Sequence, residues 1–208
     1  MSEVTKLCTA SCLQQSVMNF GILLIQGLVN SFGTAVMAAF AAAVKIDTLA
    51  YMPAQEFGNA YSLFISQNYG AGDRERVAKG TKAAIWISVS FCILISVIVV
   101  CFSKPLLMVF IERGSQGILS IGAEYLWIEG SFYFGIGILF LLYGYYRGIH
   151  RPEMALVLTI ISLGTRVVLA YVLAPVVGVR GIWSAIPIGW ILADVTGLVY
   201  MVKMRGRK

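Results

Sequence analysis

Long apolar runs separated by short polar breaks dominate the chain, and their lengths predict membrane-spanning helices. Six runs reach the roughly 20 residues that a helix needs to cross the hydrocarbon core of a bilayer. They cover residues 12–32, 34–68, 81–102, 118–146, 153–176 and 181–202. The second and fourth runs are longer than one upright crossing requires, so we expect a tilt, a kink or a protrusion into water.

Composition supports this reading and defines the fold class as an all-α integral membrane protein. Charged residues make up 12% of the 208-residue chain, and the mean hydropathy is +0.82. A soluble domain carries about a quarter charged residues, because its surface faces water. The net charge of +6 would suggest nucleic acid in a soluble protein. Here the basic residues set orientation instead, so we expect the lipid bilayer as a partner and no nucleic acid.

The distribution of lysine and arginine predicts which side of the membrane each loop occupies. Eleven basic residues fall on one side of the six runs: Lys6, Arg74, Arg76, Lys79, Lys82, Arg147, Arg151, Lys203, Arg205, Arg207 and Lys208. The other side carries Lys104, Arg113 and Arg180. Because the positive side is cytoplasmic, we predict a multi-pass protein of the plasma (inner) membrane with both termini in the cytoplasm.

Features typical of enzymes are missing from the sequence. No HExxH motif and no paired histidine cluster occurs, and the lone His150 cannot supply a metal triad. The four cysteines form no CxxC pair. We therefore expect no catalytic residues, no metal site and no cofactor. The one longer outer loop, residues 103–117 with Pro105 near its start, predicts a short interfacial helix.

The stretch at residues 64–80, "FISQNYGAGDRERVAKG", combines glycines with basic residues and raises the question of phosphate binding. A phosphate-binding P-loop requires G-x-x-x-x-G-K-[ST] between a strand and a helix, and these parts are missing. The simpler interpretation is that Gly70 and Gly72 end the second helix and that Asp73 caps the third. The basic residues would then hold this turn in the cytoplasm.

This same stretch resembles the cytoplasmic signature of the multidrug and toxic compound extrusion (MATE) family. The likeness extends upstream through "QGLVNSFGTAVMAAFAAAVKIDTLAYMPAQEFGNAYS", residues 26–62, and covers essentially the whole chain from about Ser11. Family members are about twice as long, with twelve helices in two six-helix lobes that each carry the signature. This chain holds one copy and resembles the second lobe, so we expect residues 1–208 to form a single six-helix lobe.

The resemblance implies the C-terminal half of a cation-coupled multidrug efflux transporter. Such transporters exchange sodium or protons for organic, often cationic compounds. A working unit would then need a separate N-terminal six-helix half or a homodimer, because transport sites of this kind lie between repeats. Three explanations of a half-length chain stay open: a truncated gene, an internal start or a split transporter. The alternative function is a non-transporting membrane scaffold or an inactive remnant of such a transporter.

Ionisable residues inside the spans are the candidates for transport chemistry, because they are costly in lipid and face a cavity or a partner. The second span holds Lys45, Asp47 and Glu56, with Pro53 between the acids as an expected helix kink. Lys45 and Glu129 both lie roughly 16 Å from the outer side, so their pairing is geometrically allowed. An analogous depth argument allows Arg166 to pair with Asp194, and for that pair we favour a structural role.

The family resemblance adds further candidates for binding substrate or cation. Gln26 and Asn30 lie on the first helix of the lobe, where some members have a glutamate that this chain lacks. Glu129 lies on the helix where some members place an acid of the second lobe. The signature loop contributes Gln67, Asn68, Gly70 and Gly72. The binding set that the sequence suggests is therefore Glu129, Asp47, Lys45, Gln26 and Asn30.

Overall fold

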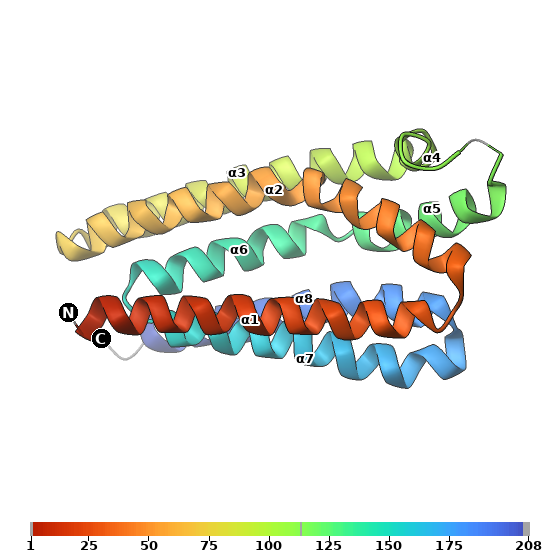
Figure 1. Cartoon of the computed structure of the whole chain (residues 1–208). Coiled ribbons are helices and arrows are strands. Elements are labelled where there is room, and N and C mark those ends of the chain that lie inside the picture. The colour runs from red at the N-terminus through yellow and green to blue at the C-terminus, as the bar shows by residue number, and fades with distance from the viewer. Residues whose placement is uncertain (1, 113, 206–208) are drawn as a thin grey trace.

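The computed structural model describes residues 2–112 and 114–205, and within these ranges it contains helices and turns. In chain order the helices are α1 (Ser2–Asn30), α2 (Thr34–Gly70), α3 (Arg74–Cys101), α4 (Ser103–Leu107), α5 (Gln116–Gly130), α6 (Tyr133–Gly148), α7 (Pro152–Val177) and α8 (Val179–Arg205) (Figure 1). The all-α class expected from the sequence is confirmed.

Five helices of the described chain are long and apolar enough to cross a membrane, namely α1, α2, α3, α7 and α8. The fourth run, predicted as one helix over residues 118–146, is divided instead. α5 and α6 meet at a bend of 52°, so the pair counts as a sixth crossing only if it forms one broken span. The hydroxyl of Ser131 bonds to the carbonyl of Trp127 at 2.6 Å, a local bond that competes with the helix ladder at this point.

The loop at residues 103–117 contains the short helix that Pro105 led us to expect. α4 spans Ser103–Leu107, and the apolar side chains that follow it, Met108, Val109 and Phe110, are exposed. Such a short helix cannot cross a bilayer, and an exposed apolar edge of this kind suits the membrane interface. Arg113, which we assigned to this loop, lies outside the described residues.

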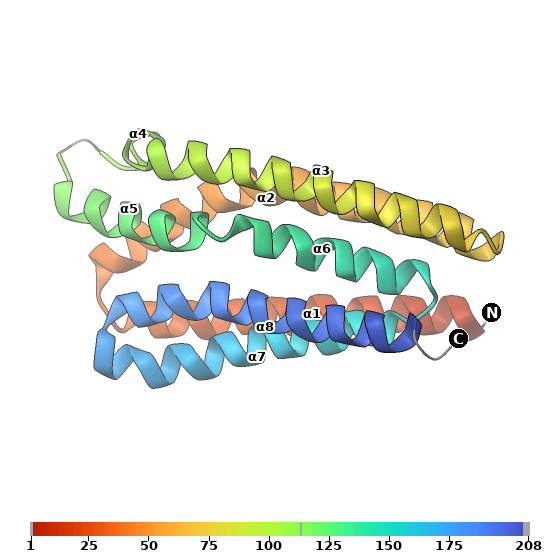
Figure 2. The same cartoon turned by 180° about the vertical axis from the view of Figure 1, so that it is seen from behind.

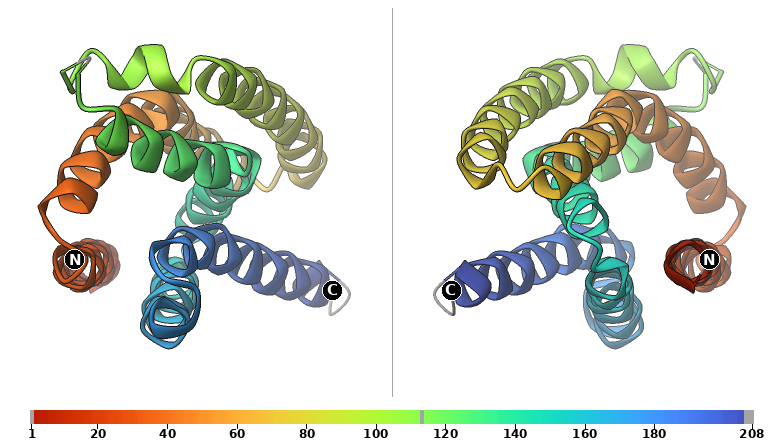
Figure 3. Two further views of the ribbon diagram at one scale, coloured as in Figure 1. Left: turned by 90° about the vertical axis from the view of Figure 1, so that its right-hand side faces the viewer. Right: turned by 90° about the vertical axis from the view of Figure 1, so that its left-hand side faces the viewer.

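The helices form a bundle in which α6 is central. Viewed along the bundle, α6 lies between a layer containing α2, α3 and α5 and a layer containing α7 and α8, with α1 beside α7 (Figure 3). The start of α1 and the end of α8 lie at the same end of the bundle, together with the α2–α3 and α6–α7 turns (Figures 1 and 2). The basic residues of those turns therefore gather at one end, while Arg207 and Lys208 lie outside the described residues.

Glycines allow α2 and α6 to approach closely along the halves nearest the α2–α3 and α6–α7 turns. A Cβ placed on Gly144 would lie 2.4 Å from the carbonyl oxygen of Gly58, and one on Gly148 would lie 2.7 Å from the side chain of Ile65. Small residues four apart allow this kind of backbone contact between membrane helices. The contact fixes α6 against α2, which places the start of α6 beside the middle of α2.

Candidate functional site

Buried polar groups gather where α5 ends and α6 begins. Glu129 is the penultimate residue of α5, and Tyr133 is the first residue of α6. Glu129 still accepts a backbone hydrogen bond from Phe132 at 3.0 Å, so the chain turns tightly between the two helices. A broken helix deep in a bundle offers free backbone groups and a helix N-terminus, which is a recurring feature of transport sites.

Two carboxyl groups meet at this break, and we call Asp47 and Glu129 the carboxyl pair. Asp47 comes from α2 and is 2% exposed, while Glu129 is 3% exposed. The hydroxyl of Tyr133 donates a hydrogen bond to Oδ1 of Asp47. Tyr125 and Glu129 adjoin the same carboxyl. The structure therefore brings together two of the residues that the sequence suggested for binding.

The carboxyl pair retains capacity to bind a further group. Oδ2 of Asp47 and Oε2 of Glu129 are buried and have no hydrogen-bond partner among the described residues. Buried polar atoms in folded proteins nearly always have partners, so unpartnered oxygens need an explanation. Two acids side by side in a low-dielectric site also repel each other when both are ionised. A bound cation or proton would satisfy both requirements.

Arg166 of α7 supplies a positive charge that interacts with the carboxyl pair. It interacts electrostatically with both Asp47 and Glu129, and its buried Nε has no hydrogen-bond partner within the described chain. One guanidinium beside two carboxylates leaves the cluster with one excess negative charge when both acids are ionised. The net charge of the cluster therefore suits one added positive charge.

The expected pairing of Arg166 with Asp194 is wrong. The described residues show no ion pair between them, and Oδ1 of Asp194 has no hydrogen-bond partner. The Cβ of Arg166 lies close to Gly189 on α8, but its charge interacts with Asp47 and Glu129. Equal depth on adjacent helices allowed the pairing, whereas the direction of each side chain around its helix prevents it.

The allowed pairing of Lys45 with Glu129 is also wrong. Lys45 is exposed, and its Nζ lies over the ring of Phe110 at 5.5 Å from the ring centre. Two residues along a helix correspond to a rotation of about 200°, because a turn takes 3.6 residues. Asp47 therefore faces the bundle interior, and Lys45 lies on the opposite side of α2, over Phe110 of the loop that follows α4.

The other candidates of the two first helices lie away from the carboxyl pair. Gln26 and Asn30 are exposed on α1, one turn apart. Pro53 is an exposed residue inside α2, which continues without interruption from Thr34 to Gly70 and curves between its ends (Figure 1). The structure thus gathers neither Gln26 nor Asn30 into the site at the helix break.

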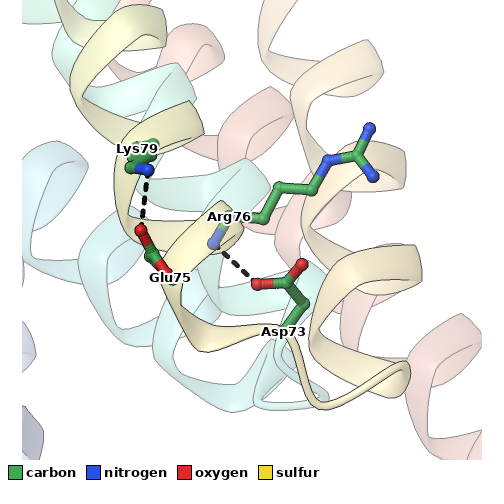
Figure 4. A network of polar contacts seen from close by, with 4 residues as sticks. All are labelled: Asp73, Glu75, Arg76 and Lys79. Carbon is green, nitrogen blue, oxygen red and sulfur yellow. Dashed lines mark hydrogen bonds and ion pairs between the residues drawn. The ribbon is translucent and has the colours of Figure 1, made fainter.

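The signature loop has the local structure that its sequence predicted. α2 ends at Gly70, Gly72 adopts a positive φ of 77°, and Asp73 caps α3 by accepting a hydrogen bond from the amide of Arg76 at 2.9 Å (Figure 4). Gln67 is exposed at the end of α2. The amide of the buried Asn68 side chain bonds to the carbonyl of Phe64 at 2.7 Å. The loop therefore makes a tight turn between two membrane helices.

Sequence reasoning missed the tyrosines that surround the carboxyl pair, although a signal was present. Tyr125, Glu129 and Tyr133 recur every four residues, the spacing of one helix face. Both tyrosines are 1% exposed, Tyr125 on α5 and Tyr133 on α6 beyond the break. An acid between two tyrosines at this spacing is a signal, because buried polar groups require hydrogen-bond partners and these three side chains can supply them to one another.

A second polar site, also missed, lies between α1, α2 and α6. Arg147 donates hydrogen bonds to Asn59 and to the carbonyl of Tyr143, both at 3.2 Å, and Gln14 donates one to Thr159 at 3.0 Å. They border a cavity of about 130 Å³ whose lining includes one guanidinium and no carboxylate. The lining residues are Ser11, Gln14, Gln15, Met18, Gln55, Asn59, Phe140, Tyr143 and Arg147.

Comparison with known proteins identifies the class to which this arrangement belongs. The family model for MatE matches residues 10–172, and the chain belongs to that family. It is 29% identical over 198 residues to the probable multidrug resistance protein YpnP of Bacillus subtilis (strain 168), and 23% identical over 184 residues to the probable multidrug resistance protein NorM of Thermotoga maritima.

Solved structures of MATE transporters contain the same fold as this chain. A crystal structure of MATE in complex with MaL6 superposes with a TM-score of 0.87 at 22% identity, covering 95% of this chain and 45% of that one. An outward-facing multidrug resistance MATE family transporter gives a TM-score of 0.86 at 23% identity. The alignments cover 95% of this chain but 44% of YpnP, and 87% of it but 39% of NorM. The chain therefore spans about half the length of the curated relatives it matches.

Proposed function

We propose that this chain is the C-terminal lobe of a cation-coupled multidrug efflux transporter. In this proposal α5 and α6 form one broken crossing, which gives six crossings and places both termini in the cytoplasm. The lobe works in the plasma membrane with an N-terminal six-helix half or with a second copy of itself. Membership of the MatE family and the half-length match to multidrug resistance proteins support this assignment.

The carboxyl pair is the observation that carries the coupling part of the proposal. Asp47 and Glu129 are buried beside a helix break, each with an unpartnered oxygen. Carboxylate and hydroxyl oxygens suit a hard cation, and a carboxylate also accepts a proton. Binding of one sodium ion or one proton would neutralise the charge that Arg166 leaves unbalanced. Its release would restore repulsion at the break and favour a different bend between α5 and α6.

The cargo in this proposal is an organic compound, often a cation, that binds between the two lobes. A single lobe supplies one wall of such a central site, so transport requires the second lobe. Gln26 and Asn30 are exposed polar side chains on α1 and are proposed to contact cargo on that wall. Lys45, Pro53 and the signature residues Gln67, Asn68, Gly70 and Gly72 are proposed to support the movements of α2 rather than to bind cargo.

A cellular efflux assay tests the proposal. The chain would be produced in a host that lacks its own exporters, alone and together with the N-terminal half of YpnP, and the accumulation of a fluorescent organic cation such as ethidium would be followed. We expect lower accumulation only when both halves are present, and a return to the host level with Asp47→Asn or Glu129→Gln. Glu75→Gln, an exposed acid of the α2–α3 turn, is the matched control and should leave efflux unchanged.

The scaffold or remnant alternative makes a different prediction in the same assay. Accumulation would then stay at the host level with either half and with both, although the chain reaches the membrane. Efflux that requires both halves but is unchanged by Asp47→Asn and Glu129→Gln would support the transporter assignment. It would reject the carboxyl pair as the coupling site.

A further inference from the structure

Asp194 of α8 is a third buried acid, separate from the carboxyl pair. Its side chain is 7% exposed, and Oδ1 has no hydrogen-bond partner within the described chain. The carboxyl is directed to α6, because a Cβ placed on Gly135 would lie 3.7 Å from Oδ2. Trp190, one turn earlier on α8, lies equally close to that position. The carboxyl of Asp194 therefore packs beside the first turn of α6 at an ordinary van der Waals distance.

Among the residues that the structure describes, no cation forms an ion pair with Asp194. From α6, Tyr143 interacts electrostatically with it. From α7, Arg166 passes close to Gly189 but acts on the carboxyl pair instead. From α5, Tyr125 packs on Trp183, three turns of α8 away from Asp194. Asp194 therefore lies at membrane depth without a compensating charge, and a carboxyl in that position avoids the cost of ionisation by holding a proton.

Asp194 and Asp47 reach the same helical turn from different sides. Asp47 bonds to Tyr133, the first residue of α6, and Asp194 faces Gly135, two residues later. The amide of Gly135 donates a hydrogen bond to the carbonyl of Phe132 at 2.9 Å. Phe132 lies between α5 and α6, so this bond ties the first turn of α6 to the break. A helix N-terminus stabilises a nearby negative charge and does so only within the first turn. A change in the bend would therefore change how readily Asp194 ionises.

We propose that Asp194 is a second proton-binding carboxyl of this lobe, linked to the carboxyl pair through the first turn of α6. A proton from water binds a carboxylate oxygen of Asp194 and forms an O–H bond, and the bond breaks when the proton returns to water. The neutral form fits the packed arrangement of α6 against α8 in this structure. The ionised form requires the amides of the first turn of α6, or water, to come closer.

Infrared spectroscopy of the membrane-reconstituted chain tests the protonation of Asp194 without requiring transport. A protonated buried carboxyl gives a carbonyl stretching band, which disappears when the group ionises at alkaline pH. We expect one such band to be absent from Asp194→Asn and present in Asp47→Asn, Glu129→Gln and the exposed control Glu75→Gln. A spectrum of Asp194→Asn identical to that of the wild type would overturn the proposal, as would loss of the same band in Glu129→Gln.

A pH profile of efflux, measured with both halves present, tests the linkage, which rests on the proposed function. Asp194→Asn should flatten or shift the profile, and Asp194→Glu should restore much of the wild-type profile because it keeps a titrating group. A profile unchanged by Asp194→Asn rejects the linkage. Failure of the proposed function itself has a distinct signature, since no efflux would then occur while the infrared band of Asp194 is still present.

Discussion

The hydroxyl of Tyr133 donates a hydrogen bond to the carboxylate of Asp47, which joins the first turn of α6 to the middle of α2. Both residues are buried, and Glu129 and Arg166 adjoin the same carboxyl. The bond therefore connects the break in the fourth span to a helix that continues to the signature loop. A change of charge on Asp47 would act on both helices together.

Replacing Tyr133 by Phe removes this bond and leaves a second carboxylate oxygen of Asp47 without a partner. Because an unsatisfied buried polar group costs about 1–3 kcal/mol, Tyr133→Phe should lower the free energy of unfolding by that amount. Thermal unfolding in detergent measures the effect. Tyr171→Phe is the control, since Tyr171 is 48% exposed on α7 and should tolerate the change. Equal effects of the two substitutions would contradict the assigned role of Tyr133.

Arg166 should couple energetically to the carboxyl pair and not to Asp194. In a double-mutant cycle, Arg166→Gln and Glu129→Gln should show an interaction energy of about 0.5–3 kcal/mol, as groups sharing one electrostatic cluster do. The cycle of Arg166→Gln with Asp194→Asn should be additive to within about 0.5 kcal/mol. Denaturant unfolding in mixed micelles provides the free energies. The opposite pattern would restore the pairing that depth alone suggested.

The close approach of α2 and α6 makes Gly144 intolerant of any side chain. Since a Cβ would lie 2.4 Å from the backbone carbonyl oxygen of Gly58, Gly144→Ala should force the helices apart. Overpacking of this kind costs about 1–3 kcal/mol, measured as a lower unfolding midpoint. Gly27→Ala on α1 is the matched control, because nothing lies within 4 Å of its Cβ position. The contact would be refuted if both variants unfolded at the same midpoint.

Asp73 should stabilise the first turn of α3 through its bond to the amide of Arg76. Asp73→Ala removes the cap, which typically costs about 1 kcal/mol. Hydrogen exchange of the amides in the first turn of α3 should accelerate, while exchange in the middle of α3 stays unchanged. Asp73→Asn, which keeps a capping oxygen, should preserve most of the protection. Exchange at the wild-type rate in Asp73→Ala would show that the cap is dispensable.

Local sequence signals predicted local structure well in this chain. Gly70, Gly72 and Asp73 form a turn and a cap because backbone freedom and side-chain capping depend on neighbouring residues alone. The apolar runs likewise located the helices, since crossing a bilayer fixes a minimum length. The length of the fourth run predicted a tilt, a kink or a protrusion, and the structure has a bend of 52° between α5 and α6. The position of that bend was not predicted, because the composition is apolar on both sides of Ser131.

Pairing between helices could be predicted only in part. Depth along a helix follows from counting residues, and counting put Glu129 level with Lys45, two residues before Asp47. The structure brings Asp47 and Glu129 together. The direction of a side chain depends on the rotation of each helix within the bundle, which counting does not provide. That is why Lys45 lies over the ring of Phe110, and why Arg166 interacts electrostatically with the carboxyl pair.

The central claim, that the carboxyl pair couples cation entry to export, is tested most directly in proteoliposomes containing this chain with the N-terminal half of YpnP. Movement of a fluorescent organic cation would be recorded after imposing a sodium gradient, a proton gradient or neither. We predict transport driven by one of the two gradients and abolished in Asp47→Asn and Glu129→Gln but not in Glu75→Gln. Gradient-driven transport that continues at the wild-type rate in both carboxyl variants would contradict the claim.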